Sequence, residues 1–466
     1  MEKKPFPKPI PIKKMIGPSF IILALGLGSG EVILWPYLAA NFGLGIAWGA
    51  VLGITIQFFM NLEIERYALV RGESVFVGLA KLFKKAPSWF ILSTFVGFGI
   101  PGIIAASAKV LGNVLGLGNF KWLAIGMLLV IGIMLSVGKT VYDMMESFTT
   151  KLILISVPFI LLLTFLSAKG ADWTALAQGL VGQGDGYLFL PEGIFIASFF
   201  AAFAYSGAGG NLNLTQSIYV KEKGYGMGKY SQKIAGLFRA EDGEQSVRLE
   251  GHSFALTKQN INNFNLWWKR INIEHGIVFW FIGALTMCLL MLLAYTTAYG
   301  SETNAEGIQF VMNQGALLSQ TLSPVIGTLF LLAVSLMLFQ TQLGVLDSSS
   351  RIMAENFAIK KIGRKKDAKV HLSKIYFSFL WAQITFGIIL FLFNITEPRF
   401  LIVLGAVLNA IAMFVHIGLV NWMNHKTLPE PLQAKLWRKI IMLIAFGIFG
   451  GFSLFTVWEQ IEKLLS

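Results

Sequence analysis

The first long apolar segment of the chain, residues 17–42, is interrupted at its centre by the hexapeptide GLGSGE at positions 26–31. Glycine weakens a helix by roughly 1 kcal/mol relative to alanine. An ionisable group at the bilayer midplane costs about 2.5–3.5 kcal/mol on insertion scales. Backbone unwinds at that depth only where protein buries it or where it lines a cavity, because lipid satisfies no hydrogen bonds. An apolar helix broken in this way is typical of a transport site.

The composition indicates a membrane protein: 55% of the 466 residues are hydrophobic and only 14% are charged, against about 25% charged in soluble domains. A membrane helix needs roughly 20 apolar residues. Segments of that kind lie at 17–42, 44–69, 88–112, 121–139, 146–168, 191–219, 274–298, 323–350, 371–393, 398–423 and 438–461. The sequence therefore predicts an all-α membrane protein with about eleven transmembrane helices.

Basic residues predict how these helices are oriented, since cytoplasmic connections carry an excess of Lys and Arg. Residues 1–16, 220–273 and 360–366 are rich in them, whereas 299–322 contains two acids and no base. We expect a multi-pass protein of the cytoplasmic (inner or plasma) membrane, with the N-terminus inside and the C-terminus outside. The net charge of +13 follows from this asymmetry and from contact with membrane lipids, so nucleic acid is not an expected partner.

A second broken segment appears in the other half of the chain. Residues 203–213, FAYSGAGGNLN, place glycines and small polar side chains in the middle of the sixth apolar segment. Paired breaks at corresponding places in two halves point to a binding site between inverted repeats. We therefore expect a cytoplasmic tail and a single membrane domain at 17–466. This domain divides into repeat one at 17–168, repeat two at 191–423 with its cytoplasmic loop 220–273, and an extra helix at 438–461.

Several classes of function are disfavoured by what the sequence lacks. The single cysteine, Cys288, excludes an intrachain disulfide and a cysteine-based metal cage. There is no phosphate-binding loop of the Walker type, which argues against ATP-driven transport. No nucleophile–base pair stands out, so an enzyme and a bound cofactor are not expected. A secondary transporter remains, with a non-transporting sensor as the alternative.

The residues of the first segment also resemble a known family. The run GPSFIILALGLGSGEVILWPYLAANFG at 17–43 looks like the opening span of Nramp-type (natural resistance-associated macrophage protein) divalent-metal transporters. There, a Gly-Pro pair leads into a helix broken at an Asp-Pro-Gly-Asn motif. RYALVRGES at 66–74 and FQTQLGVLDSSSRIMAENF at 339–357 are further similarities. The resemblance implies a LeuT-type fold with 5+5 inverted repeats, broken helices 1 and 6, and a divalent metal as substrate.

The chain departs from that family where the metal is bound. Residues 28–31, Gly-Ser-Gly-Glu, fall on the Asp-Pro-Gly-Asn motif, so a glycine replaces the metal-binding aspartate and a carboxylate follows three positions later. Gly-Gly-Asn at 209–211 falls on a Met-Pro-His motif, and Asn409 falls where a family glutamine approaches the substrate. The thioether and imidazole ligands of the family are therefore missing.

Combining the two breaks with this resemblance gives a candidate substrate site made of oxygen ligands and backbone. Carboxylate, carbonyl and amide oxygens favour Mg²⁺ or Mn²⁺ over softer transition metals. We expect Glu31 and Asn211 to be the metal ligands. The whole expected site consists of Gly28, Ser29, Glu31, Ala208, Gly209, Asn211, Asn213 and Asn409.

Three alternatives stay open from the sequence. Gly28-Ser29-Gly30 could instead present N–H groups to the carboxylate of an amino acid or another small organic solute. Glu31 could be structural, protonated and hydrogen-bonded. The pairs Glu63/Arg66 and Asp347/Arg351 have helical i, i+3 and i, i+4 spacing, which suits either interfacial pairing or a gate. The sequence leaves the oligomeric state open and is compatible with a monomer.

Overall fold

The structure is a computed structural model of the whole chain. It describes residues 3–15, 17–28, 30–137, 140–231, 249–300, 307–364, 370–396 and 398–465. Apart from one short hairpin, the regular elements in these ranges are helices.

The first half contains one broken helix and a series of continuous ones. In chain order its elements are α1 (Pro18–Gly26), the π-helical turn η2 (Gly30–Leu34), α2 (Trp35–Phe42), α3 (Ala47–Arg71), α4 (Val75–Leu82), α5 (Ala86–Phe98), α6 (Gly102–Val114), α7 (Lys121–Val137) and α8 (Val141–Ser167). A short helix, α9 (Gly170–Gly179), and the hairpin of β1 (Gln183–Gly184) and β2 (Tyr187–Leu188) connect the halves.

The second half begins with another broken helix. Its elements are α10 (Ile196–Ala204), the 3-10 turn η4 (Gly210–Thr215), α11 (Gln216–Lys223), the 3-10 turn η5 (Gly226–Tyr230), α12 (Lys258–His275), the π-helical turn η7 (Gly276–Phe281), α13 (Ile282–Ala298), α14 (Ile308–Thr321), α15 (Pro324–Arg364), α16 (Leu372–Leu392), α17 (Pro398–Thr427) and α18 (Leu436–Leu465).

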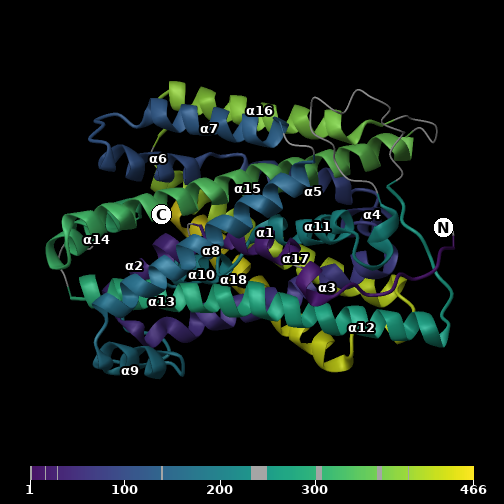
Figure 1. Cartoon of the computed structure of the whole chain (residues 1–466), viewed down its shortest axis with the longest axis horizontal. Coiled ribbons are helices and arrows are strands. Elements are labelled where there is room, and N and C mark those ends of the chain that lie inside the picture. Colours follow the sequence, from purple (N-terminus) through teal and green to yellow (C-terminus); the bar gives the residue numbers. More distant parts are fainter. Residues whose placement is uncertain are drawn as a thin grey trace.

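The long helices run roughly lengthwise through the molecule (Figure 1). Helices α7 and α16 pack together along the upper edge in this view, and α12 and α13 run lengthwise through the lower part. The broken helices lie between these two pairs of helices, where α1 packs against α8, α11 and α15. The central place of α1 puts its unwound residues inside the protein, as backbone unwound in a membrane requires.

Seven of the described helices are long and apolar enough to cross a membrane, and the bent pair α1 and η2–α2 brings the number to eight. Helix α7 is apolar but has only 17 residues. Each of the eleven predicted segments coincides with helix, but the count of eleven spans stays a prediction. So do the division into repeats and the orientation in the membrane.

Two predicted spans differ in extent from the helices found. The third divides into α5 and α6 at residues 99–101, because Pro101 supplies no backbone N–H and disfavours helical backbone in the residue before it. The seventh begins already at Lys258, inside the predicted loop 220–273, and runs to Ala298. A helix of 41 residues is about 60 Å long, so it extends well beyond a hydrocarbon core of about 30 Å.

The outer surface of the bundle is apolar. Leu154 and Ile155 on α8 are 60% and 72% exposed, and Trp122 on α7 and Leu454 on α18 are 64% and 73% exposed. A soluble monomer rarely exposes large contiguous apolar surface, whereas lipid covers such a surface in a membrane. This surface agrees with a multi-pass membrane protein.

Segments predicted to lie on one side of the membrane meet at the end of the bundle where the N-terminal segment lies, at the right in Figure 1. Lys4 donates its backbone N–H to Ser253, Arg71 donates to the carbonyl of Thr427, and Lys223 pairs with Glu146. We call this end the N-terminal end of the bundle.

Candidate functional site

The first break lies between α1 and η2. Gly28 donates its N–H to the carbonyl of Gly26, and Val32 donates to that of Gly28, so the regular helical pattern stops and restarts here. The two parts of the helix differ in direction by 45°. The break falls where the sequence predicted it, although Ser29 lies outside the described residues.

The second break comprises Tyr205–Gly209 and the 3-10 turn that follows it. It begins within the stretch 203–213 in which the sequence predicted a break. Gly209 has a φ of 69°, a left-handed conformation that glycine adopts without steric cost. Ala208 lies in this break and is buried.

The two breaks face each other. A Cβ atom at Gly26 would lie 2.9 Å from the Cα of Gly207, and one at Gly30 would overlap the carbonyl oxygen of Tyr205. Such close approach of two backbones is possible only without side chains. The prediction that helices 1 and 6 are broken is therefore confirmed, and the two breaks lie opposite each other.

This contact gives a direct test of the packing. Gly30→Ala is expected to reduce both thermal stability and transport, because the methyl group must displace the backbone of the second break. Overpacking of this kind costs about 1–3 kcal/mol. Gly126→Ala on α7 is the matched control, since a Cβ there meets nothing within 4 Å. Thermal unfolding of both variants in the same detergent checks the prediction, and equal behaviour of the two would contradict it.

Glu31 is fully buried beside the first break. A Cβ atom at Gly26 would lie 3.1 Å from its Oε1, which places the carboxylate next to the contact between the two breaks. Neither carboxylate oxygen has a hydrogen-bond partner among the residues described. Burial of an unpaired carboxylate is very unfavourable. The group therefore needs a proton or a cation.

Asn409 on α17 approaches the second break. Its Nδ2 donates to the hydroxyl of Tyr205 at 3.0 Å and to the carbonyl of Gly97 at 3.2 Å. A Cβ at Gly210 would overlap its Oδ1, and that oxygen is buried without a hydrogen-bond partner in the described part of the chain. The amide oxygen of Asn409 therefore lies at the second break without a hydrogen-bond partner among the described residues.

The other two predicted asparagines, both buried in η4, differ in their contacts. Asn211 donates to the hydroxyls of Ser93 at 2.8 Å and Thr94 at 3.1 Å, so its amide points toward α5, while its Oδ1 has no partner among described residues. Neither amide atom of Asn213 has one. No contact within the described ranges joins Asn211 to Glu31. The structure therefore does not bring these two expected ligands together.

Two polar residues at the breaks were missed in the sequence. Gln57 on α3 donates to the carbonyl of Ala204 at 3.0 Å and accepts the N–H of Gly209 at 3.3 Å, and so satisfies backbone on both sides of the second break. Thr341 on α15 donates to the carbonyl of Ala24 at 3.1 Å and packs against Gly28. Each is a polar side chain in an apolar span, which is the signal that could have identified it.

A second missed group lies between the breaks and the N-terminal end. Ser19 donates to Glu274 at 2.6 Å and lies 2.8 Å from Nδ1 of His275. The same nitrogen lies 3.4 Å from Glu65, which accepts a hydrogen bond from Gln216. The Ser19 hydroxyl and the Glu65 carboxylate both lie at Nδ1 of His275, and its Nε2 is buried without a partner in the described structure. A hydrolytic triad would have them at opposite ring nitrogens, so this arrangement differs from one.

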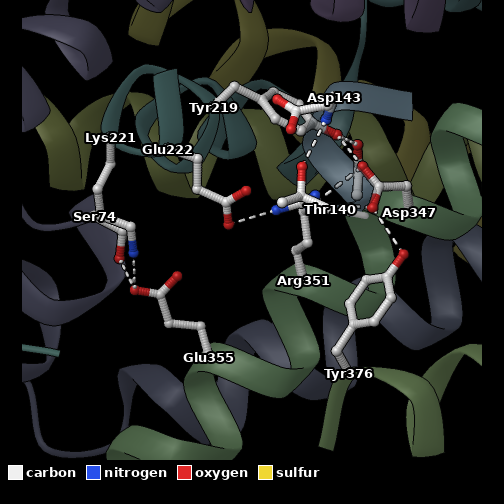
Figure 2. Close-up of polar contacts among 11 residues, drawn as sticks. Ser74, Thr140, Asp143, Tyr219, Lys221, Glu222, Asp347, Arg351, Glu355 and Tyr376 are labelled. Carbon is white, nitrogen blue, oxygen red and sulfur yellow. Dashed lines mark hydrogen bonds and ion pairs between the residues drawn. The ribbon is translucent and has the colours of Figure 1, made fainter. Parts of the chain in front are cut away.

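Charged residues further toward the N-terminal end join α11 to α15 (Figure 2). Arg351 is fully buried, and its guanidinium contacts Asp347 at 2.8 Å and Glu222 at 2.7 Å. Tyr219 and Tyr376 donate to Asp347 as well. The predicted i, i+4 pair is therefore part of a network that ties the second half of the broken sixth helix to its neighbours.

Glu355 makes a parallel connection in the same view. It accepts a hydrogen bond from Ser74 at 2.6 Å and pairs with Lys221 at 3.2 Å (Figure 2). Glu63 and Arg66 also pair, at 2.8 Å, and Arg66 lies over the ring of Trp268. These contacts show the ion pairs formed but leave the choice between interface and gate open.

Comparison with solved structures identifies the fold. The structure is similar to the manganese transporter of Eremococcus coleocola, seen in two mutants with one glutamate replaced and in a complex with an aromatic bis-isothiourea substituted compound. The TM-scores are 0.70, 0.69 and 0.68, with 12% sequence identity, 100% of this chain covered and 91% of each of those chains covered. No protein-family model matches the chain, and no curated protein matches its sequence.

At this identity the likeness establishes the fold. It confirms the expected fold, an all-α membrane-protein architecture like that of the manganese transporter, with broken first and sixth helices. The protein is thus a multi-pass membrane protein with a transporter fold.

Proposed function

We propose that this protein is a secondary transporter that moves a hard divalent cation, Mg²⁺ or Mn²⁺, across the cytoplasmic membrane through the contact between its two breaks. The observation that supports this proposal most directly is the Glu31 carboxylate. It is fully buried beside both breaks and has no hydrogen-bond partner in the described part of the protein. A cation bound there would compensate its charge.

The other buried side-chain oxygens of the chain favour a hard ion. The oxygens of Asn213, Asn409 and Gln340 are buried and unpartnered among the described residues. Within the same residues no three His, Cys, Asp or Glu side chains are placed to hold a metal. Amide, carbonyl and carboxylate oxygens suit Mg²⁺ or Mn²⁺. An ion such as Mg²⁺, which keeps several of its waters, requires few charged ligands.

The structural comparison supports a metal as substrate. The similar solved structures are of a protein named as a manganese transporter, and both breaks of its fold type are present here. At 12% identity the likeness does not extend to individual ligands. The substrate is therefore proposed from the residues of this chain.

The alternative of an organic solute is less favoured by the contacts at the breaks. A substrate carboxylate would meet the Glu31 carboxylate. The backbone N–H groups of Gly28 and Gly209 already donate to the carbonyl of Gly26 and to Gln57. An amino acid would have to place its amine at Glu31. Measuring uptake of metal ions and of amino acids distinguishes the two substrates.

The test is uptake by the purified protein in proteoliposomes, with Mg²⁺, Mn²⁺, Ca²⁺, Cd²⁺ and amino acids offered separately and in competition. We expect uptake of Mg²⁺ or Mn²⁺ that excess Cd²⁺ inhibits only weakly, because the expected ligands include neither thioether nor imidazole. Empty liposomes measure leakage. Strong Cd²⁺ uptake would contradict the oxygen site, and amino-acid uptake without metal uptake would contradict the proposed substrate.

A further inference from the structure

A cleft of about 350 Å³ lies at the N-terminal end of the bundle. One wall is the N-terminal segment, with Pro7 and Lys8, and another is the end of α11, with Glu222 and Lys223. It is completed by Gly224, Gly228, Lys229 and Ser231 and by Trp267 of α12. The cleft therefore borders the second half of the broken sixth helix.

The charges around this cleft are mainly positive. Lys8, Lys223 and Lys229 line it, and Glu222 is its one acid among the lining residues. Glu222 is bound to Arg351 at 2.7 Å, and Lys223 is bound to Glu146 at 2.5 Å. Lys8 and Lys229 are exposed and form no ion pair with other described residues. Within the described ranges, two ammonium groups at the cleft therefore have no ion-pair partner.

The walls are held in place by hydrogen bonds to the backbone of the N-terminal segment. Trp267 donates to the carbonyl of Pro7 at 3.0 Å, and Tyr230 donates to that of Pro5 at 2.8 Å. Arg270 donates to Pro9 and Ile10. A site formed before its ligand arrives loses less entropy on binding than a flexible one.

From this geometry we infer a binding site for a small phosphate-bearing anion. Lysine binds phosphate as a compact point charge. Of the three lysines that line the cleft, Lys8 and Lys229 have no ion pair among the described residues, which suits an anion with more than one charge. A volume of 350 Å³ is at the lower end of the range of about 300–1,000 Å³ for ligand pockets. A cleft of this volume fits inorganic pyrophosphate, or the diphosphate group of a small molecule, better than a large cofactor.

A bound anion would connect Lys8 to Lys223 and Lys229. It would thereby tie the N-terminal segment, which α12 already holds, to α11. Movement of α11 relative to α12 then requires this connection to break. The expected consequence is slower transport with the anion bound.

Calorimetric titration of inorganic pyrophosphate into the protein in phosphatidylcholine nanodiscs tests the site independently of any transport. We expect a dissociation constant below about 1 mM that weakens as salt is added. Lys8→Gln with Lys229→Gln should weaken binding at least about tenfold. The matched control is Lys258→Gln with Lys269→Gln, which removes the same charge from two exposed lysines of α12 outside the cleft.

A second set of nanodiscs containing phosphatidylglycerol distinguishes the source of the phosphate. Unchanged pyrophosphate binding there supports a soluble ligand, and competition that disappears in the Lys8/Lys229 variant supports a lipid headgroup in the same cleft. Absence of pyrophosphate binding in both lipids would overturn the inference. Equal weakening in the control variant would do the same, because binding would then depend on net charge alone.

Discussion

Glu31→Gln is expected to abolish cation uptake while leaving folding intact. The amide keeps the shape of the side chain and one acceptor oxygen but removes the charge that attracts a hard ion. Removing one partner of a buried charge interaction costs about 2–5 kcal/mol, which corresponds to a loss of about 30-fold or more. Because the carboxylate has no hydrogen-bond partner among the described residues, no protein contact there is lost. Initial uptake rates in proteoliposomes measure the effect.

Two further variants give this experiment its controls. Glu31→Asp keeps the charge and shortens the side chain, so it should retain part of the uptake. Glu192→Gln removes a carboxylate from an exposed position and should transport normally. Unchanged uptake by Glu31→Gln would show that Glu31 is structural and protonated. Loss of both stability and uptake in Glu31→Gln would also indicate that Glu31 has a structural role.

The architecture could be predicted because its signals are local. Long apolar segments and the glycines at 26–30 and 207–210 are read without knowing what packs against them. The contact of Gly26 with Gly207 and of Gly30 with Tyr205 explains why those positions are glycine. The helix that contains the seventh predicted span begins at Lys258, well before that span, because polar residues of a helix that extends beyond the membrane carry no apolar signal.

The site was predictable only in part, since it depends on which helices meet. Asn409 does approach the second break, whereas Asn211 donates to Ser93 and Thr94 on α5. The sequence pattern of η4 does not show which way an asparagine amide points. Gln57 was missed for the same reason: its role comes from packing against Ala204 and Gly209.

The Arg351 network joins two helices through buried charges. Arg351 is in contact with Asp347 and Glu222, and all three are buried. Glu222 belongs to α11 and Asp347 to α15. Burial makes each charge dependent on its partners, because solvent cannot replace them. Any motion that separates α11 from α15 must break the Arg351–Glu222 contact.

Arg351→Gln is therefore expected to be among the most destabilising single substitutions outside the breaks. It leaves Asp347 and Glu222 without their guanidinium partner, and loss of one member of a buried pair costs about 3–5 kcal/mol. Arg351→Lys should recover only part of this stability, because an ammonium group lacks the guanidinium fork that reaches both acids. Asp347→Asn added to Arg351→Gln should also recover part of the stability, since one unpaired charge is removed.

Lys374→Gln, at an exposed position on α16, is the control for these variants. Thermal unfolding of the four proteins in detergent ranks them, and equal stability of Arg351→Gln and Lys374→Gln would show that the network does not hold α11 to α15.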